Sequence, residues 1–401
     1  MAQPKEGSIR KRGNGTFEYR VYTGKGYKSF YGKTEAEVKR KYREYKKSLN
    51  INTGKEPEEE VVPGTSNATG GNITLDDYTG YWLKMYKYGT IAESTYDRLE
   101  NIYVKHIKTS AIAQKDIRDV TSDDIQMLIN SKKTVLSLSS IKKIKEVLYP
   151  CLKHAMKQNL ITSNPAESVV IPKKTVLDEQ EKRLYFYSDE EVSLIVQAMS
   201  QKYYQNNPRR YRYAPLFSII LNTGLRIGEC MALNWDDVNI NNKTLKVNKS
   251  VLVSYERDES LNKVKKKQTI GPTKTLKGNR VVPLNDSAIE AFQLMRERNE
   301  DLGIVSDLIF SNYEGRLLTI KSVQTTFKSI CNDLGIVYKG LHALRHTFGS
   351  LLIKNHVDIK IVSELLGHTD VRFTYNRYIH IIQEQKAEAI NLINITPRLD
   401  S

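Results

Sequence analysis

The chain has 401 residues and 39% of them are hydrophobic, which is enough apolar material for two or three separately packed domains. It carries 62 Lys and Arg against 46 Asp and Glu, a formal net charge of +16, so its field should attract polyanions. No apolar run approaches the ~20 residues that span a bilayer, and the basic N-terminus is not followed by the apolar segment of a secretion signal. We therefore expect no membrane association and a cytoplasmic protein.

The spacing of cysteine and histidine argues against disulfides and metal sites. Cys151, Cys230 and Cys331 lie far apart, with no paired spacing, which favours a reducing compartment. His342 and His346 stand at i,i+4, but no Glu lies between them to complete the zinc-protease helix pattern. We expect neither a metal ion nor a cofactor.

Residues 1–50 concentrate positive charge, with 14 basic against 5 acidic side chains, so nine of the sixteen net charges lie in the first eighth of the chain. Gly7–Thr16 supplies turn residues, Phe17–Tyr22 and Tyr27–Tyr31 alternate like strands, and Thr34–Leu49 has a helical pattern. A solvated charged tail is the alternative, but the aromatic content is too high for disorder. We predict a small α+β DNA-binding module that presents basic side chains and tyrosines to a groove.

Residues 51–73 are acidic and rich in Pro, Gly, Ser and Asn, which indicates a linker. The next segment, 74–172, is predicted to be an all-α domain whose helices each open with a Ser or Thr suited to capping. Pro150 should kink or break the last helix unless packing overrides the lost hydrogen bond. The expected helices are Thr74–Tyr88, Ser94–Lys108, Thr121–Asn130 and Ser139–Gln158.

A third domain, mainly α with some strands, is predicted at 183–401 after a second linker. Ser188 opens a capping box with Glu191 before the apolar helix 192–199, and 213–221 reads as a second buried helix. Residues 245–253 and 280–284 alternate like strands on either side of a lysine-rich hairpin. Helices resume from Ser287.

Arg226 follows a turn and precedes a helix in the segment Thr223–Glu229. The backbone N–H groups at a helix N-terminus already favour an anion, so this arginine is well placed to bind one. The alternative is a structural pair between Arg226 and Glu229 on one helix face. Without further context the two interpretations are equally good.

Further along, His342 and Arg345 stand at i,i+3 in Leu341–His346, which couples a titratable imidazole to a fixed cation. His368 directly follows the helix-terminating glycine of Leu-Leu-Gly-His, and Tyr378 follows ten residues later. The order of an arginine, a lysine-rich hairpin, His-x-x-Arg, Gly-His and Tyr is far more specific than any of these motifs alone.

With these motifs the sequence resembles the tyrosine recombinase family of phage-type integrases, and most of all the integrases of conjugative transposons. The resemblance implies an N-terminal arm-binding module, a helical core-binding domain and a C-terminal catalytic domain that cuts and rejoins DNA. The blocks that carry it are Thr223–Glu229, Thr273–Leu284, Leu341–His346 and Leu365–His380.

The resemblance assigns a role to each motif residue, and the chemistry explains the residue types. Attack on a phosphodiester builds charge on its nonbridging oxygens, which the guanidiniums of Arg226 and Arg345 can grip. Tyr378 would be the nucleophile, its deprotonation eased by the cationic site, with His342 as the candidate base. Tyr375, three residues earlier, is the weaker candidate for nucleophile.

Two further roles come from the resemblance alone. A lysine on the hairpin protonates the departing 5′ oxygen, for which Lys274 is the first choice and Lys277 the alternate. His368 donates a hydrogen bond to the scissile phosphate. The product would be a 3′-phosphotyrosine with a free 5′-hydroxyl, and two such exchanges would pass through a four-way junction without ATP.

The resemblance also implies partners: double-stranded DNA at element ends and target sites, and further copies of the chain in a tetramer on that DNA. The segment Glu384–Ile395 has apolar residues at helical spacing, and family members often dock such a tail onto a neighbouring protomer. An accessory factor for excision is a further candidate partner. The rival interpretations are a type IB topoisomerase and a catalytically idle DNA-binding protein, against which stand the separate basic N-terminal module and the intact set of candidate residues.

Overall fold

The computed structural model describes residues 8–13, 15–22, 27–34, 37–38, 41, 71–175, 186–200, 211–273 and 276–391. The chain forms two compact units, one made of Met1–Tyr81, Lys108–Ile125 and Leu148–Val169, the other of Trp82–Ile107, Gln126–Val147 and Val170–Ser401. Within the described ranges, no helix has both the length and the apolar character needed to cross a membrane. The domain boundaries expected from the sequence stay a prediction.

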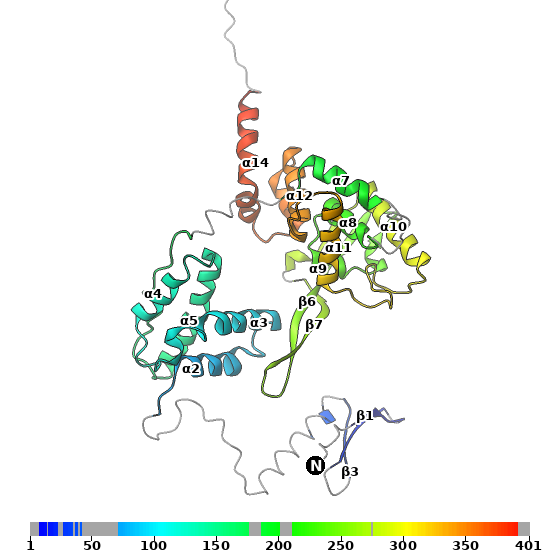
Figure 1. The fold of residues 1–401 in the computed structure, drawn as a ribbon. Coiled ribbons are helices and arrows are strands. Elements are labelled where there is room, and N and C mark those ends of the chain that lie inside the picture. The colour runs from blue at the N-terminus through cyan, green and yellow to red at the C-terminus, as the bar shows by residue number, and fades with distance from the viewer. Residues whose placement is uncertain are drawn as a thin grey trace, which may run out of the picture. The chain divides into compact units, whose positions relative to one another are not determined.

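The N-terminal region contains a three-stranded antiparallel sheet of β1 (Ser8–Lys11), β2 (Phe17–Tyr22) and β3 (Tyr27–Gly32), in that order (Figure 1). Strands β2 and β3 confirm the prediction, whereas β1 lies in a stretch expected to form turns. It becomes a strand because it pairs with β2, with Arg10 opposite Glu18. The predicted helix at 34–49 lies mostly outside the described residues.

The four helices predicted between 74 and 158 are present. Two are continued by a π-helical segment, α2 by η1 (Leu83–Lys87) and α3 by η2 (Tyr103–Ile107). Thr74 and Thr121 cap their helices as expected, accepting from the backbone N–H of Asp77 and Asp124 at 3.1 and 3.2 Å. The helices are α2 (Leu75–Trp82), α3 (Glu93–Ile102), α4 (Ser122–Ser131) and α5 (Leu138–Lys157), with a 3₁₀ turn η3 (Ala111–Gln114).

Two of the predicted caps are wrong, because Ser94 and Ser139 lie inside α3 and α5 rather than before them. The first helical residue of α3 is Glu93, preceded by Ala92 without a side-chain cap. Helix α5 continues through Pro150. The side chains of Leu148, Cys151 and Leu152 around that proline are fully buried, so packing offsets the lost backbone hydrogen bond.

The C-terminal region is built around helix α8, against which α7, α10 and α12 pack (Figure 1). Most side chains of α8 are buried. The ring centroids of Phe217 on α8 and Phe327 lie 4.7 Å apart, with the rings tilted by 38°. The predicted capping box holds, because Ser188 Oγ accepts from Glu191 N and Ser188 N donates back to the Glu191 carboxylate. The helices are α7 (Asp189–Ser200), α8 (Ala214–Thr223), α9 (Ile227–Met231), α10 (Asp286–Asp301), α11 (Ile320–Asp333), α12 (Leu341–Lys354), α13 (Ile359–Leu366) and α14 (Val371–Asn391).

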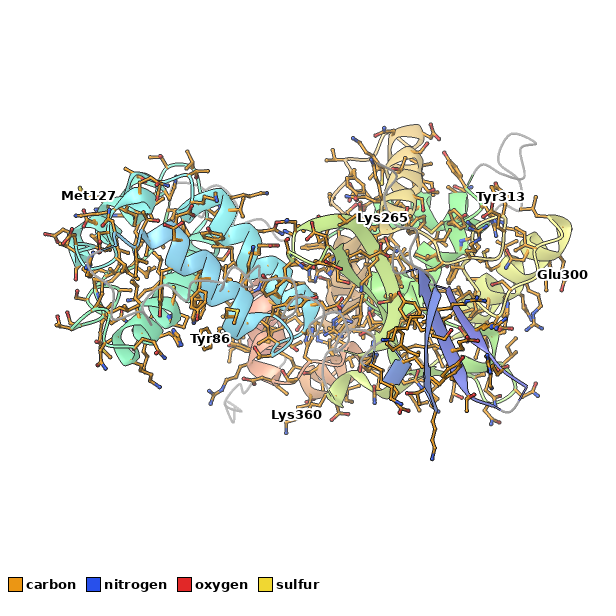
Figure 2. All side chains as sticks on the ribbon, turned by 90° about the horizontal axis from the view of Figure 1, so that it is seen from below. Tyr86, Met127, Lys265, Glu300, Tyr313 and Lys360 are labelled. Carbon is orange, nitrogen blue, oxygen red and sulfur yellow. The ribbon has the colours of Figure 1, made fainter. Side chains whose placement is uncertain are left out.

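The strands of this region differ from the prediction. The expected strand at 245–253 is interrupted at Asn248, and its two halves join different sheets because they pair with different partners. The hairpin strand β7 was not predicted; it carries several lysines, of which Lys265 is exposed (Figure 2). One sheet has the order β4 (Val238–Asn239), β5 (Thr244–Val247), β8 (Arg280–Pro283), and the other pairs β6 (Lys249–Arg257) with β7 (Lys263–Pro272).

Gly224 ends helix α8 and sets the direction of the chain toward Arg226. Its φ is +64°, and its N–H bonds to the Ile220 carbonyl at 2.9 Å, which is the left-handed cap that glycine favours. A Cβ at this position would lie 2.4 Å from the Phe348 ring. The position therefore excludes side chains for two reasons, backbone conformation and space.

Comparing Gly224→Ala with Gly335→Ala should separate the free-energy cost of the backbone conformation from that of the steric overlap. Gly335 also has a left-handed φ, of +68°, but nothing lies within 4 Å of an added Cβ. Gly335→Ala should cost about 1–2 kcal/mol of unfolding free energy for the backbone conformation, and Gly224→Ala should cost about 1–3 kcal/mol more for the steric overlap. Urea unfolding midpoints measure both, and equal losses would contradict the close approach of Phe348.

Candidate active site

Arg226 precedes α9 and lies half-exposed at the surface. Its Nη1 donates to Glu229 Oε1 at 2.7 Å, its backbone N–H donates to the other carboxylate oxygen at 3.0 Å, and its Nη2 donates to the Gly367 carbonyl at 3.3 Å. The structural pair with Glu229 is thus present, yet 39% of the side chain stays accessible. The pairing holds Arg226 in place without hiding it from an anion.

Arg345 lies on α12 and is buried, 4% exposed. Its Nη1 donates to the Gly224 carbonyl at 2.6 Å, and its Nη2 donates to the Leu366 carbonyl. Burial and the charge of Arg226 lower the pKa of Arg345 to about 9, so it remains a cation at neutral pH. Arg345 and Arg226 therefore meet at the same end of α13.

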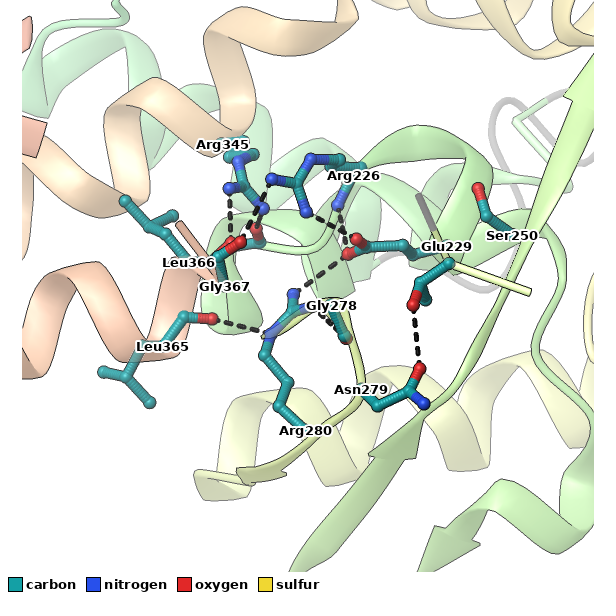
Figure 3. Close-up of polar contacts among 12 residues, drawn as sticks. Arg226, Glu229, Ser250, Gly278, Asn279, Arg280, Arg345, Leu365, Leu366 and Gly367 are labelled. Atoms are coloured by element: carbon teal, nitrogen blue, oxygen red, sulfur yellow. Dashed lines mark hydrogen bonds and ion pairs between the residues drawn. The ribbon is translucent and has the colours of Figure 1, made fainter. Parts of the chain in front are cut away.

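The carboxyl end of α13 gathers three arginines (Figure 3). The consecutive carbonyls of Leu365, Leu366 and Gly367 accept hydrogen bonds from Arg280, Arg345 and Arg226 in turn. These groups lack partners within the helix and carry the negative end of its dipole, so cations are favoured there. Gly367, with φ +63°, ends the helix and allows the chain to turn toward His368.

His368 directly follows this glycine. Its Nδ1 lies 2.7 Å from Thr374 Oγ1, and its ring packs edge-on against Phe373 with centroids 4.9 Å apart. Burial and the charges of Arg345 and Arg226 lower the pKa of His368 to about 3. The imidazole is therefore neutral at physiological pH and can still donate one hydrogen bond.

His342 lies in the first turn of α12, one turn before Arg345. Part of its ring is open to solvent, yet packing around it and the guanidiniums of Arg345 and Arg226 lower its pKa. A lowered pKa leaves the imidazole unprotonated at neutral pH, the state that a base requires. The second histidine of the motif, His346, lies 2.9 Å from an Nη of Arg377 and has a pKa lowered to about 4 by burial and that charge.

Lys274 lies outside the residues that the structure describes. The loop that carries it is described on both sides. Lys277, in the 3₁₀ turn η5 (Leu276–Gly278), donates from Nζ to the Thr369 carbonyl at 3.0 Å. Thr273 Oγ1 donates to Asn279 Oδ1 at 2.7 Å (Figure 3). The bond from Lys277 places the turn η5 beside Thr369, the residue after His368.

Tyr378 lies on α14 and is almost wholly buried, 1% exposed, in a cluster with Ile353, Val362 and Leu366. A Cβ added to Gly349 would lie 2.2 Å from its hydroxyl oxygen, so this ring packs directly against α12. Burial raises the pKa of Tyr378 to about 12, although Arg345 and Arg377 act in the opposite direction. In this placement burial outweighs the cationic surroundings, so the phenol is harder to ionise than a free tyrosine.

Tyr375, the alternative nucleophile, is 37% exposed on the same helix. Among the described parts of the chain, no group of three or more His, Cys, Asp or Glu side chains is arranged to hold a metal ion. Two participants were given no role in the site by the sequence analysis, although both lie within its motif blocks. Glu229 entered only as an alternative partner of Arg226, and Arg280 was one of several basic residues in the block Thr273–Leu284.

Comparison with known proteins decides the family. Residues 185–385 match the Phage integrase family, and residues 74–133 match the N-terminal SAM-like domain of phage integrases. The first match alone spans half of the chain. The chain belongs to the phage integrase family. It is a tyrosine recombinase, an enzyme that cleaves and rejoins DNA in the excision and integration of mobile elements.

Related integrases match this recombinase over most of its length. A XerC-like tyrosine recombinase of Caldanaerobacter subterraneus is 29% identical, over 92% of this chain and 91% of that protein. The ICEBs1 integrase of Bacillus subtilis is 23% identical, over 73% and 75%. The integrase of transposon Tn1549, solved in complex with a circular intermediate DNA, shares the fold with a TM-score of 0.62 at 20% identity, over 80% of this chain and 100% of that one. The predicted fold class of this integrase is thereby confirmed.

The packing of Tyr378 on Gly349 predicts strong coupling between the two positions. Gly349→Ala alone should destabilise the recombinase by about 1–3 kcal/mol, because the new methyl group overlaps the phenol ring. In a Tyr378→Ala background the overlap is absent, and alanine is favoured over glycine in a helix by about 1 kcal/mol. The same substitution should then be neutral or stabilising. Urea unfolding of the four proteins completes the double-mutant cycle, and equal costs in both backgrounds would rule out this contact.

The lowered pKa of His368 predicts a dependence of stability on pH. An unfolded histidine titrates near ~6.5, whereas folded His368 stays neutral to about pH 3. Between these values the unfolded chain binds more protons, so stability falls as the pH falls below 6.5. His368→Gln should reduce this loss by up to about 1.4 kcal/mol per pH unit. Urea midpoints at pH 7, 6 and 5 measure it, and identical slopes for both proteins would contradict the shift.

Proposed function

We propose that this recombinase cleaves DNA at a site where Arg226 contacts the scissile phosphate and the fixed charge of Arg345 helps to hold it, with Tyr378 as the nucleophile. The observation that carries the proposal is the convergence of Arg226, Arg345 and His368 on the carboxyl end of α13. Two guanidiniums and an imidazole meet there, with Arg226 more than 100 residues before Arg345 and His368 in the sequence. Such a set of donors suits the nonbridging oxygens of a phosphodiester.

The two arginines differ in how accessible and how firmly held their guanidiniums are. Arg226 is accessible and can reach an incoming phosphate directly, while Glu229 and the Gly367 carbonyl limit its motion. Arg345 is buried between the Gly224 and Leu366 carbonyls and supplies a fixed positive charge behind it. Donors fixed before the reaction stabilise developing charge at little reorganisation cost.

The two histidines act as neutral groups in this proposal. If the Thr374 hydroxyl donates to Nδ1 of His368, the ring proton lies on Nε2, from which it can bond to a phosphate oxygen. His342, with its lowered pKa, accepts the phenolic proton of Tyr378. The same cluster of guanidiniums lowers both pKa values, so the phosphate site and the protonation of its histidines are linked.

The chemical step exchanges one phosphoester for another. Tyr378 Oη forms a bond to phosphorus, the bond from phosphorus to the 5′ oxygen breaks, and Lys274 gives its proton to that leaving oxygen, with Lys277 as the alternate donor. The 3′-phosphotyrosine retains the energy of the broken ester, so a second 5′-hydroxyl can reverse the step without ATP. Two such exchanges in sequence join new strands through a four-way junction.

Tyr378 has to move before it attacks. A side chain that is 1% exposed cannot contact a DNA phosphate, and its pKa of about 12 keeps it protonated. We propose that DNA binding and assembly shift α14 so that the phenol leaves its packing against Gly349 and reaches the arginines. The tail that begins in α14 and extends beyond the described residues would then dock onto a neighbouring protomer.

The partners in this proposal are double-stranded DNA and further copies of the chain. A lambda integrase tetramer bound to a Holliday junction shares the fold, with a TM-score of 0.53 at 18% identity, over 90% of this chain and 95% of that one. By analogy we propose a tetramer on the element ends in the bacterial cytoplasm, with an excision factor as a further partner. The N-terminal sheet would bind arm sites through basic side chains such as Arg20 and Lys28.

The nucleophile is tested with a nicked duplex that carries a candidate element end and releases the short strand on cleavage. Wild type and Tyr375→Phe should both give a covalent protein–DNA band on a denaturing gel, whereas Tyr378→Phe should give none. Both substitutions remove one hydroxyl group and keep the ring, so each controls for packing. A band that persists in Tyr378→Phe and disappears in Tyr375→Phe would reassign the nucleophile. Absence of a band from wild type on every element end would favour an idle DNA-binding protein.

A further inference from the structure

Arg280 lies at the centre of the contacts that organise the candidate site, although the sequence analysis assigned it no role there. It is the first residue of β8, and its side chain is 8% exposed. Its Nη2 donates to Glu229 Oε2 at 2.9 Å, its Nε donates to the Leu365 carbonyl at 2.9 Å, and its Nη1 donates to the Gly278 carbonyl at 3.1 Å (Figure 3). All three nitrogens of its guanidinium thus donate to other parts of the protein.

The carboxylate of Glu229 is shared between two arginines. Its Oε1 accepts from Arg226 Nη1 and its Oε2 from Arg280 Nη2, at 2.7 and 2.9 Å. Burial alone would raise the pKa of Glu229, but the charges of Arg280 and Arg226 outweigh it and hold the pKa below its ordinary value. The carboxylate is thus ionised, and its single negative charge is divided between two cations.

This division affects the residue that faces the DNA. If Arg280 were absent, the whole negative charge of Glu229 would act on Arg226, because the other hydrogen bonds to that carboxylate come from Arg226 itself. The positive charge that Arg226 offers to a phosphate would then be partly cancelled, and its guanidinium would be held more tightly to the protein. Arg280 therefore leaves Arg226 free to act on an anion.

We propose that Arg280 is a positioning residue that balances the charge of Glu229 and thereby keeps Arg226 available to the scissile phosphate. The inference rests on the proposed function of Arg226. Arg280 also joins three parts of the site, namely Glu229, the end of α13 and the loop before β8 that carries the lysines. The Arg280 side chain also passes close to Gly367, where an added Cβ would lie 3.0 Å from one of its Nη atoms.

The experiment measures the single-turnover cleavage rate of the full chain on the nicked duplex, together with the dissociation constant for the same DNA. Arg280→Met keeps much of the side-chain volume and removes the charge. It should lower the cleavage rate about tenfold or more, while the dissociation constant changes less than about twofold. The reason is that the altered charge of Arg226 acts mainly on the charge that develops on the phosphate in the transition state. Arg280→Lys retains the charge and should keep at least about one third of the wild-type rate.

The decisive variant is Arg280→Met combined with Glu229→Gln. Glutamine still accepts a hydrogen bond from Arg226 but carries no charge, so the need for Arg280 disappears. The double variant should cleave about threefold or more faster than Arg280→Met alone, which a merely structural role for Arg280 does not produce. Glu229→Gln alone should also be slower than wild type, since an amide holds Arg226 less firmly than a carboxylate.

Three outcomes overturn the proposal: Arg280→Met cleaves at the wild-type rate, the double variant loses activity by the product of the single losses, or Arg280→Lys falls as low as Arg280→Met. If Arg280→Met does not fold in a thermal melt, Arg280→Lys and the double variant still decide between charge balance and packing. Wild type serves as the separate check on the proposed function. A wild type that forms no adduct refutes that function, whereas an active wild type with an equally active Arg280→Met refutes only the role of Arg280.

Discussion

The catalytic region depends on the hydrogen bonds that the carboxyl end of helix α13 accepts from arginine side chains. Three successive carbonyls there accept from three arginines that come from α12, from the turn before α9 and from strand β8. Guanidiniums repel one another, and they gather only because the helix end and the carboxylate of Glu229 offset their charge. Four separate segments of the chain are thereby brought to one place.

The surplus of positive charge at this place accounts for the protonation states around it. Burial and the guanidiniums lower the pKa of His342, His346 and His368, and Arg226 contributes to the lowered pKa of Arg345. A bound phosphate would supply the negative charge that the cluster lacks. In the proposed mechanism, part of the binding free energy of DNA is therefore a release of this repulsion.

Much of this organisation was open to prediction because it is local. The capping boxes at Ser188 and Thr121 depend on residues three positions apart, and the apolar run of α8 needs no partner to be recognised as buried. The residues of the site were predicted from the order of their motifs and a family resemblance. Their convergence on α13 depends on contacts across more than 100 residues, which spacing alone does not contain.

The failures share the same cause. Asn248 divides a stretch of continuous alternation because β5 pairs with the distant β8, whereas β6 pairs with β7 in a separate sheet. Arg280 contacts Leu365 across 85 positions, so nothing near it marks it out from the other basic residues. Tyr378 was expected in a cationic site that eases its deprotonation, and nothing in the sequence indicated that its phenol would be buried beside Gly349.

The burial of Tyr378 gives one side chain two duties. As a large ring in a closely packed cluster with Ile353 and Leu366, it contributes to the cohesion of α12, α13 and α14, and in the proposed mechanism its hydroxyl is the nucleophile. A substitution at this position therefore affects both the stability of the fold and the proposed chemistry. Only the hydroxyl can be removed without cost to packing, so an inactive descendant of this integrase can keep its shape with phenylalanine in that place.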